Sequence, residues 1–273
     1  MEGRRREVSG NLQESSILIM GFFSRSYKSI LKYLVLGEIK VKYKNRFLGA
    51  AWAVIDPLML MLIYLFLIKF IFQRGGPNYA IELLVGLITY RWFSTSIMAS
   101  SRSLLSNGKL LQTVKFPYSV LPLSRVLING VDLLVGFVIL FIFVYFYEIP
   151  PSWNWLWIPV LLLLEFQFII ASSLIVSIIG VYFRDLLNIL TFGVRILLYA
   201  SPILYGIEQV PEHIQPTYLM LSPLSSLMVS FKNVLIFDKA PSVYLAIFIG
   251  LSALLWIIAI YSFRTRKNIS KDL

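Results

Sequence analysis

The stretch VLPLSRVLINGVDLLVGFVILFIFVYFY, residues 120–147, decides what kind of fold this chain can adopt. A bilayer core about 30 Å thick is crossed by roughly 20 mainly apolar helical residues, and this stretch meets that requirement. The apolar character extends through the chain of 273 residues, because 58% of them are hydrophobic. Soluble domains contain roughly 45–50% apolar residues. The sequence therefore predicts an integral membrane protein.

Five more stretches have the length and composition of membrane-spanning helices. We expect six spans in all, near residues 51–72, 80–101, 120–147, 156–181, 186–206 and 242–263. Two of them are interrupted, since the second carries Glu82 and Arg91 and the fifth carries Arg195 and Pro202. The predicted fold class is an all-α integral membrane protein with six transmembrane helices.

Basic residues gather in one set of connecting segments. If the N-terminus is inside, most of the 25 Lys and Arg residues fall in inner segments, where cytoplasmic loops carry their excess. We therefore expect a multi-pass protein of the inner (cytoplasmic) membrane with both termini cytoplasmic. We expect no signal peptide. The net charge of +11 is explained by this bias and by attraction to anionic membrane lipids rather than by nucleic-acid binding.

Few residues of the chain are suited to catalysis or metal binding. Cysteine is absent and His213 is the one histidine, so disulfides are excluded and a metal site is not expected. In the expected spans only Asp132 and Glu165 are candidates for acid–base chemistry, with no His or Cys to support them. The sequence predicts neither an enzyme nor a cofactor bound by this chain.

Residues 102–116 form a basic, half-apolar segment on the cytoplasmic side, between the second and third spans. Apolar residues recur there at helical spacings of three, four and seven: Leu104, Leu110, Leu111 and Val114. Pro117 should end the helix. A helix this short is not stable alone in water, so it needs a lipid surface, which Lys109 would suit, or a groove in a partner protein.

Four stretches carry a wider likeness: YKNRFLGAAWAVIDPLMLML (43–62), VKFPYSVLPLSRV (114–126), VYFRDLLNIL (181–190) and SPILYGIEQVPE (201–212). In order and spacing they resemble the ABC-transporter export permeases for polysaccharides and polyol phosphates, which carry O-antigen or teichoic-acid polymers. One stretch departs from that family, because LSPLSSLM (221–228) lacks the Asn that more often precedes the proline.

The resemblance implies a homodimer that binds two copies of a separate ATPase, which carries the ATP and Mg. It assigns contact with that ATPase to the segment around 102–114, as a coupling helix, and to the FRDLL motif. The residues concerned are Leu104, Lys109, Leu110, Leu111, Val114, Arg184 and Asp185. The chain itself has no G-x-x-x-x-G-K-[ST] phosphate loop, as expected of a subunit that leaves ATP to another polypeptide.

The N-terminal stretch KSILKYLVLGEIKVKYKNR, residues 28–46, has an apolar or aromatic residue at every fourth position from Leu31 to Tyr43. This pattern predicts a helix lying in the cytoplasmic membrane surface. The resemblance implies that such an interfacial helix frames the entrance for a lipid-linked diphosphate. Cations suited to a diphosphate are Lys40, Lys42, Lys44 and Arg46. Retention by anionic lipids is the alternative.

Charged residues inside the expected spans should face the bundle interior or a wet cavity. Arg91 and Arg195 could pair with Asp132 and Glu165, or they could face a channel and contact phosphates.

Three aromatic residues surround Arg91 in the sequence: Tyr90, Trp92 and Phe93. Their rings could stack on sugars in a polymer channel or pack between helices.

Residues 207–240 form an outer connection that is too apolar for a solvated loop. Two short re-entrant helices would explain its composition. The resemblance implies an outer gate in this region, and we assign Tyr205 and Pro223 to it; a cap without a gating role is the alternative.

The chain is thus expected to have a cytoplasmic N-terminal segment (1–50), a permease domain (51–263) and a cytoplasmic tail (264–273). The expected function is ATP-driven export of a polyprenyl-diphosphate-linked cell-surface polymer. Intramembrane cations, Lys69 and Arg91 among them, favour phosphate-rich teichoic acid, with O-antigen as the alternative. A secondary transporter is a further alternative, although no repeated halves are seen in the sequence.

Overall fold

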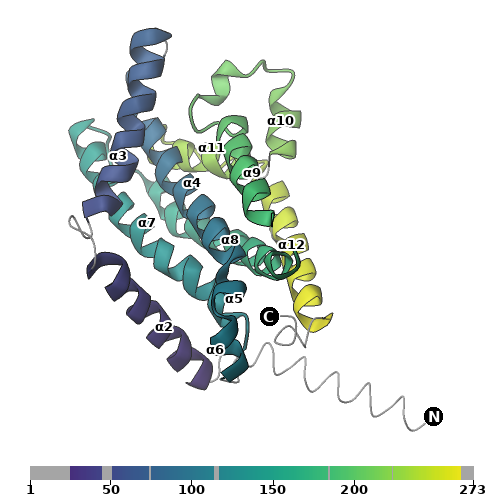
Figure 1. Ribbon diagram of the computed structural model, residues 1–273. Coiled ribbons are helices and arrows are strands. Elements are labelled where there is room, and N and C mark those ends of the chain that lie inside the picture. The colour runs from purple at the N-terminus through teal and green to yellow at the C-terminus, as the bar shows by residue number, and fades with distance from the viewer. Residues whose placement is uncertain are drawn as a thin grey trace.

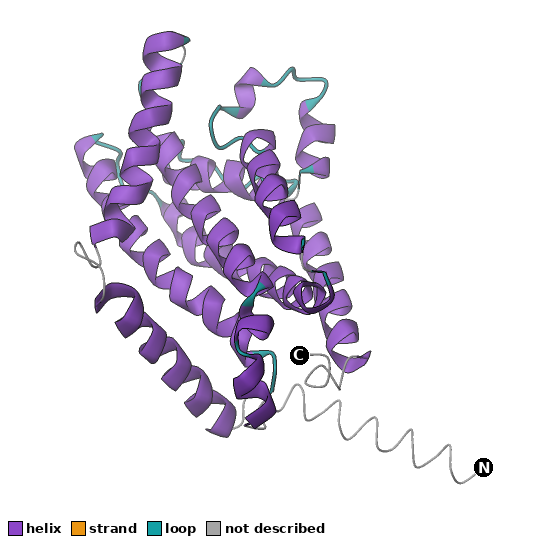
Figure 2. Ribbon diagram, viewed as in Figure 1, coloured by secondary structure: helices purple, strands orange, loops and turns teal. Residues whose placement is uncertain are grey.

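The computed structural model describes residues 25–44, 51–73, 75–113, 117–183, 185–222 and 224–265. Within these ranges every regular element is a helix, which confirms the predicted all-α class (Figures 1 and 2). In chain order the elements are α2 (Arg25–Lys44), α3 (Ala51–Leu65), the π-helix η1 (Phe66–Ile71), α4 (Tyr79–Ser101), α5 (Ser103–Ser106), α6 (Gly108–Thr113), α7 (Val120–Phe146), the 3-10 helix η2 (Trp153–Trp157), α8 (Ile158–Tyr182), α9 (Leu186–Ala200), the 3-10 helix η3 (Ile207–Gln209), α10 (Gln215–Leu221), α11 (Ser225–Leu235) and α12 (Leu245–Thr265).

Four helical segments in the described ranges are long and apolar enough to cross a membrane. They are Ala51–Ile71, Val120–Phe146, Trp153–Tyr182 and Leu245–Phe263. These four coincide with the first, third, fourth and sixth predicted spans. The other two predicted spans correspond to α4, which is long but more polar, and α9, whose 15 residues extend about 22 Å. The count of six spans stays a prediction.

The fifth predicted span ends earlier than expected because of Pro202. Ser201 at the end of α9 has extended backbone angles, with φ −99° and ψ 151°. A residue that precedes proline is driven out of helical geometry by a clash with the proline ring. The prediction of one helix over 186–206 was therefore wrong for its last six residues, which form turns and bends after Ala200.

The helix α4 lies at the centre of the bundle. It packs against α3, α7, α8, α9 and α11 (Figure 1). Most of its side chains are buried. Because protein surrounds α4, its two charged side chains have partners on neighbouring helices. Arg91 donates to Asp56 of α3 at 2.5 Å, and Glu82 lies 3.9 Å from Lys232 of α11. This enclosure explains how a helix with Glu82 and Arg91 fits inside an otherwise apolar bundle.

Two glycines allow neighbouring helices to approach α4 closely. A Cβ at Gly136 of α7 would lie 2.7 Å from the Ile88 side chain. A Cβ at Gly180 of α8 would overlap the carbonyl oxygen of Ser101, at the end of α4. The backbone of α8 is therefore in direct contact with the junction between α4 and α5.

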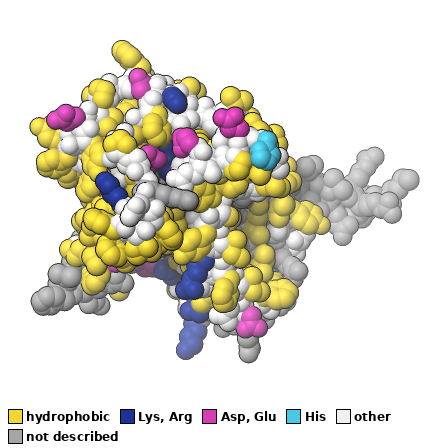
Figure 3. Space-filling view, turned by 90° about the horizontal axis from the view of Figure 1, so that it is seen from above, with side chains coloured by type: hydrophobic (Ala, Val, Ile, Leu, Met, Phe, Trp, Pro, Cys, Tyr) yellow, Lys and Arg dark blue, Asp and Glu magenta, His cyan; other side chains and the backbone are white. Residues whose placement is uncertain are grey.

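The outer helices carry the exposed apolar surface. In the first span only Ala53, Pro57 and Met61 are buried, all on one face of α3, and large side chains on the other faces are exposed. Figure 3 looks down on the end that carries α10 and α11, and it shows hydrophobic side chains around much of the visible edge. Several charged side chains are scattered among them, and a group of Lys and Arg side chains extends below the centre of the view. Such a surface suits lipid or another apolar protein surface.

Substitution of Gly180 by Ala should destabilise the protein by about 1–3 kcal/mol, because the added methyl group forces α8 away from Ser101. Thermal unfolding of the purified protein in detergent measures this loss. Gly193→Ala in α9 is the matched control, because a Cβ there meets no atom within 4 Å. Equal unfolding temperatures for the two variants would contradict the close packing at Gly180.

Candidate functional site

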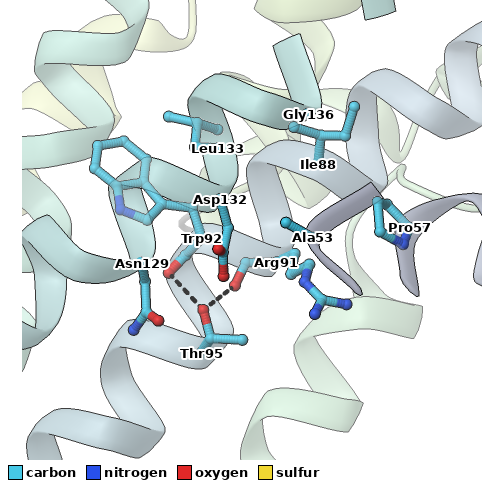
Figure 4. Close-up of a pocket in the computed structure, with 10 residues that line it drawn as sticks. All are labelled: Ala53, Pro57, Ile88, Arg91, Trp92, Thr95, Asn129, Asp132, Leu133 and Gly136. Carbon is cyan, nitrogen blue, oxygen red and sulfur yellow. Dashed lines mark hydrogen bonds between the residues drawn. The ribbon is translucent and has the colours of Figure 1, made fainter. Parts of the chain in front are cut away.

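A charged cavity of about 230 Å³ lies among α2, α3, α4 and α7. Its lining residues are Lys42, Tyr43, Trp52, Ala53, Asp56, Arg91, Thr95, Asn129 and Asp132. A narrower pocket shares five of these residues and extends toward Leu133 and Gly136 of α7 (Figure 4). The site therefore combines side chains that the sequence separates widely.

Lys42 reaches the cavity because it lies on the face of α2 that packs against α7. That face repeats every three or four residues, as in Leu31, Leu34 and Glu38, all half-buried. Lys42 Nζ lies 2.7 Å from Asp132 Oδ2 and donates to Asn129 Oδ1 at 3.3 Å.

A second donor to Asp132 comes from α2, the helix that also carries Lys42. The Tyr43 hydroxyl donates to Asp132 Oδ1 at 2.5 Å. One carboxylate on α7 therefore holds two neighbouring residues at the end of α2.

Two further contacts bind α2 to α7. Glu38 forms an ion pair with Arg125, and the Tyr27 hydroxyl lies 3.4 Å from Ser119 Oγ. Burial raises the pKa of Tyr27 to about 12, so its hydroxyl stays neutral. The predicted N-terminal helix is thus found, and it packs along α7 through these polar contacts and through half-buried apolar residues such as Leu31 and Leu34. Its place in the membrane surface stays a prediction.

The four cations assigned to the diphosphate entrance have different positions. Lys42 lines the cavity, whereas Lys40 and Lys44 are exposed on the opposite face of α2. Arg46 lies outside the described residues. The sequence pattern could not separate these lysines, because it gives no information about which face contacts α7.

Arg91 enters the cavity from α4. Its Nη2 donates to Asp56 Oδ2 of α3 at 2.5 Å, and the two side chains are 26% and 35% exposed. Arg91 Nε is buried and has no hydrogen-bond partner among the described residues. Figure 4 shows Arg91 near Pro57 of α3, with Asn129 and Asp132 on the other side of the pocket.

Of the four charges that the sequence placed inside spans, two are paired in the structure, and neither has the partner that was expected. Arg91 pairs with Asp56 and Asp132 pairs with Lys42. Glu165 is fully buried in α8, without a hydrogen-bond partner in the described part of the chain, and Arg195 is exposed on α9. Sequence analysis missed Asp56, whose one signal is a charge within the first turns of an apolar span.

The aromatic residues beside Arg91 pack between helices. Trp92 Nε1 donates to the Val126 carbonyl at 3.1 Å, and the Trp92 ring stacks on Phe166 with centroids 5.9 Å apart. The ring centroids of Phe93 and Phe168 are 5.8 Å apart.

Tyr90 hydrogen-bonds the backbone carbonyl of Val194 in α9. All three aromatic side chains beside Arg91 are buried, so in this conformation they join α4 to α7, α8 and α9. Helix packing, one of the two alternatives, accounts for their positions.

Residues 102–113 differ from the single amphipathic helix that their spacing predicted. They form two short helices, α5 and α6, separated by a turn at Asn107. Leu104 and Leu111 are buried with Leu121 and Ile178 in a small cluster. The apolar face thus packs against α7 and α8 of the same chain. These helices provide the groove that a short amphipathic helix needs, so a partner protein is not required for it.

The opposite side of α5 and α6 is open. Leu105 is 51% exposed and Leu110 is 37% exposed, and Lys109 is also exposed. Asp185 is exposed at the start of α9. Val114 and Arg184, the other two residues assigned to ATPase contact, lie outside the described residues.

Two tyrosines cap the last turn of α9. Tyr218 donates to the Ala200 carbonyl at 2.5 Å, and Tyr205 donates to the Tyr199 carbonyl at 3.1 Å. The two hydroxyls are 2.9 Å apart. These contacts satisfy carbonyl groups that have no partner within the helix.

A buried lysine holds this capped end in position. Lys232 Nζ of α11 donates to the Tyr205 carbonyl at 3.0 Å and lies 3.9 Å from Glu82 Oε2 of α4. The two short outer helices, α10 and α11, are present; their re-entry into the membrane stays a prediction. Pro223, assigned to the gate together with Tyr205, lies outside the described residues.

The stability of the protein should rise with pH above about pH 8 because of Lys232, which lies outside the spanning helices. Burial lowers the pKa of Lys232 from 10.5 to about 8, against the opposing effect of Glu82 and Glu208. Between these values the unfolded lysine binds its proton and the folded lysine releases it, so raising the pH favours folding by up to about 3 kcal/mol.

Thermal unfolding followed from about pH 8 to about pH 10 measures this gain. The variant Lys232→Met should lose the rise, since it has no titrating amine. An unchanged pH profile in that variant would show that other groups produce it.

Comparison with known proteins agrees with the likeness seen in the four sequence stretches. The sequence profile of the ABC-2 type transporter family matches residues 30–236. An O-antigen export system permease protein RfbA of Klebsiella pneumoniae is 30% identical over 231 residues, which are 84% of this chain and 89% of the relative.

A second Klebsiella pneumoniae protein of that name is 30% identical over 197 residues, or 72% of this chain and 76% of the relative. A Myxococcus xanthus protein of the same name is 30% identical over 216 residues, or 79% and 83%. The chain belongs to the ABC-2 type transporter family and is a membrane permease of the kind that works with a partner ATPase in an ABC exporter.

Proposed function

We propose that this chain is the transmembrane half of an exporter that moves a polyprenyl-diphosphate-linked O-antigen polymer out across the inner membrane. The observation that carries the proposal is the shared name of three relatives, each an O-antigen export system permease at 30% identity. Long coverage of each relative supports a common role, because the likeness extends over 72–84% of the chain.

O-antigen replaces teichoic acid as the favoured polymer. The relatives named above favour it, and the structure weakens the physical argument for the other choice. That argument rested on the cations Lys69, Arg91 and Arg195 and on the basic entrance. Arg91 is neutralised by Asp56, and Lys69 and Arg195 are exposed on the outside of the bundle. None of these three cations provides an unpaired positive charge inside the bundle for a phosphate-rich backbone.

The mechanism that we propose needs no covalent step in this chain. Two copies form the pore, and two copies of the ATPase, with ATP and Mg, bind at α5 and α6. Closure of the ATPases pushes on these short helices. The push then reaches α4, which precedes α5 directly, and α8, which contacts the end of α4 at Gly180. Both termini are cytoplasmic in this arrangement.

One observation favours a second candidate, a proton-coupled secondary transporter. Glu165 is a fully buried carboxyl group without a hydrogen-bond partner in the described ranges, and intramembrane carboxyls of this kind serve as proton sites in such transporters. Export that continues with a catalytically dead ATPase and stops after Glu165→Gln would support this candidate.

The proposed function is tested in cells that lack this permease and accumulate lipid-linked O-antigen inside. The chain, together with its ATPase, should restore O-antigen on the cell surface, whereas either protein alone should not. A parallel strain blocked in teichoic-acid export tests the other polymer. Recovery of teichoic acid without recovery of O-antigen, or recovery without any ATPase, would overturn the proposal.

Substitution of Leu110 by Asp should weaken recovery of the ATPase about tenfold on co-purification, because a charge replaces an exposed apolar contact. Leu111→Asp is the matched comparison one residue away. It should instead lower the free energy of unfolding by about 3 kcal/mol or more, since it puts a charge into the cluster with Leu121 and Ile178.

Co-purification and thermal unfolding of both variants separate the two effects. Loss of the ATPase with Leu111→Asp alone, at unchanged stability, would assign the docking surface to the opposite face of α6.

A further inference from the structure

Two cations that the sequence assigned to different sites face one cavity. Lys42 comes from α2 and Arg91 from α4, and each is held by a carboxylate on a third or fourth helix. The two pairs connect α2 with α7 and α3 with α4. The cavity of about 230 Å³ exceeds the roughly 30 Å³ that one water occupies in the liquid, so it has room for a group of several heavy atoms.

Both cations have more hydrogen-bond donors than their contacts with the described residues use. The guanidinium group has five N–H donors in a planar fork, and Arg91 binds Asp56 through Nη2, while its buried Nε has no partner among the described residues. Lys42 has three donors, and its acceptors in the described chain are Asp132 and Asn129. A forked arginine with unused donors is suited to bidentate binding of a phosphate group.

The two carboxylates compensate the charge of the cavity. Lys42 and Arg91 contribute two positive charges, and Asp56 and Asp132 contribute two negative charges. A phosphate or diphosphate offers the same cations the same kind of oxygen acceptors and a comparable negative charge. It competes with the two carboxylates for the same donors and is repelled by them. Binding to both cations therefore requires that the carboxylate side chains leave their partners and turn away from the ligand.

We infer that Asp56 and Asp132 are internal counter-ions, which hold the phosphate-binding donors of Arg91 and Lys42 until a phosphate headgroup displaces them. This inference rests on the proposed function, since the headgroup is the phosphate-bearing end of the exported lipid. It adds to that function an exchange of ligands at two cations. Without the headgroup, Arg91 and Lys42 bind the two carboxylates, and with it they bind phosphate oxygens instead.

The exchange loosens one end of α2 and leaves the other bound. Displacement of Asp132 removes its contacts with Lys42 and Tyr43, at the end of α2 that precedes α3. The ion pair of Glu38 with Arg125 and the contact of Tyr27 with Ser119 are not part of the exchange. Loss of the Arg91 contact frees the first turns of α3 as well. The cavity therefore opens locally between α2 and α3.

Ligand binding to the full-length chain in phosphatidylcholine nanodiscs tests the exchange. The probe is farnesyl diphosphate, a short polyprenyl diphosphate, and farnesol is the probe without phosphate. Asp56→Asn and Asp132→Asn should each bind farnesyl diphosphate about tenfold more tightly than the unchanged chain, because a competing anion is removed. Arg91→Gln and Lys42→Gln should bind it about tenfold more weakly.

Two variants serve as matched controls. Lys32→Gln changes an exposed lysine on the same helix as Lys42, and Glu212→Gln changes an exposed carboxylate in the outer connection. Both should bind like the unchanged chain. Weaker or unchanged binding in the two Asp→Asn variants would overturn the inference, as would an equal effect of Lys32→Gln.

A second measurement does not depend on the stability of those variants. The chain has no cysteine, so pairs of spin labels can be attached at chosen positions. Val41→Cys and Leu134→Cys are exposed positions on α2 and α7. Their separation should increase on addition of farnesyl diphosphate and not of farnesol, whereas a pair at Tyr33→Cys and Leu134→Cys should keep its distance. No change in the first pair would overturn the exchange.

Phosphatidylglycerol in the nanodiscs separates two sources of the phosphate. If it moves the first label pair as farnesyl diphosphate does, the exchange stands and membrane phospholipid is a ligand. If the diphosphate alone acts, the exchange stands and the site selects the diphosphate. Export that depends on the ATPase while the probe fails to bind would overturn this inference and leave the proposed function intact.

Discussion

The packing of α4 against α7 and α8 is the interaction on which the rest of the structure depends. A polar helix can lie within an apolar bundle when protein, rather than lipid, surrounds it and provides partners for its polar groups. The enclosure of α4 meets that condition and also brings Arg91 to the charged cavity. The same helix leads directly into α5, so the centre of the bundle is continuous with the short helices α5 and α6.

Sequence reasoning identified the helices whose surroundings are simple. The segments that expose apolar side chains over much of their surface, such as Val120–Phe146, are recognised by length and composition alone. It was less successful where neighbouring helices determine the outcome. The spacing of Leu104 and Leu111 correctly indicated an apolar face, but spacing cannot say whether that face contacts a partner or the same chain. Nor did it predict the break at Asn107.

The candidate site was found in part for the same reason. Lys42, Arg91 and Asp132 stand out as charges beside or inside apolar segments, whereas their partners are set by contacts between residues far apart in the chain. Arg91 and Asp56 are 35 positions apart, and Lys42 and Asp132 are 90 apart. No local pattern encodes such pairs. The choice of polymer had a similar weakness, because it counted cations without knowing which were already neutralised.

Because glycine has no side chain, the close contact at Gly180 has a mechanical consequence. Since the backbones of α8 and α4 are in contact at Ser101, the two long helices meet at one end without a compressible layer of side chains between them. Dense packing of this kind transmits strain with little loss. A displacement at this junction would therefore move both helices together as rigid bodies. Their opposite ends would move with it.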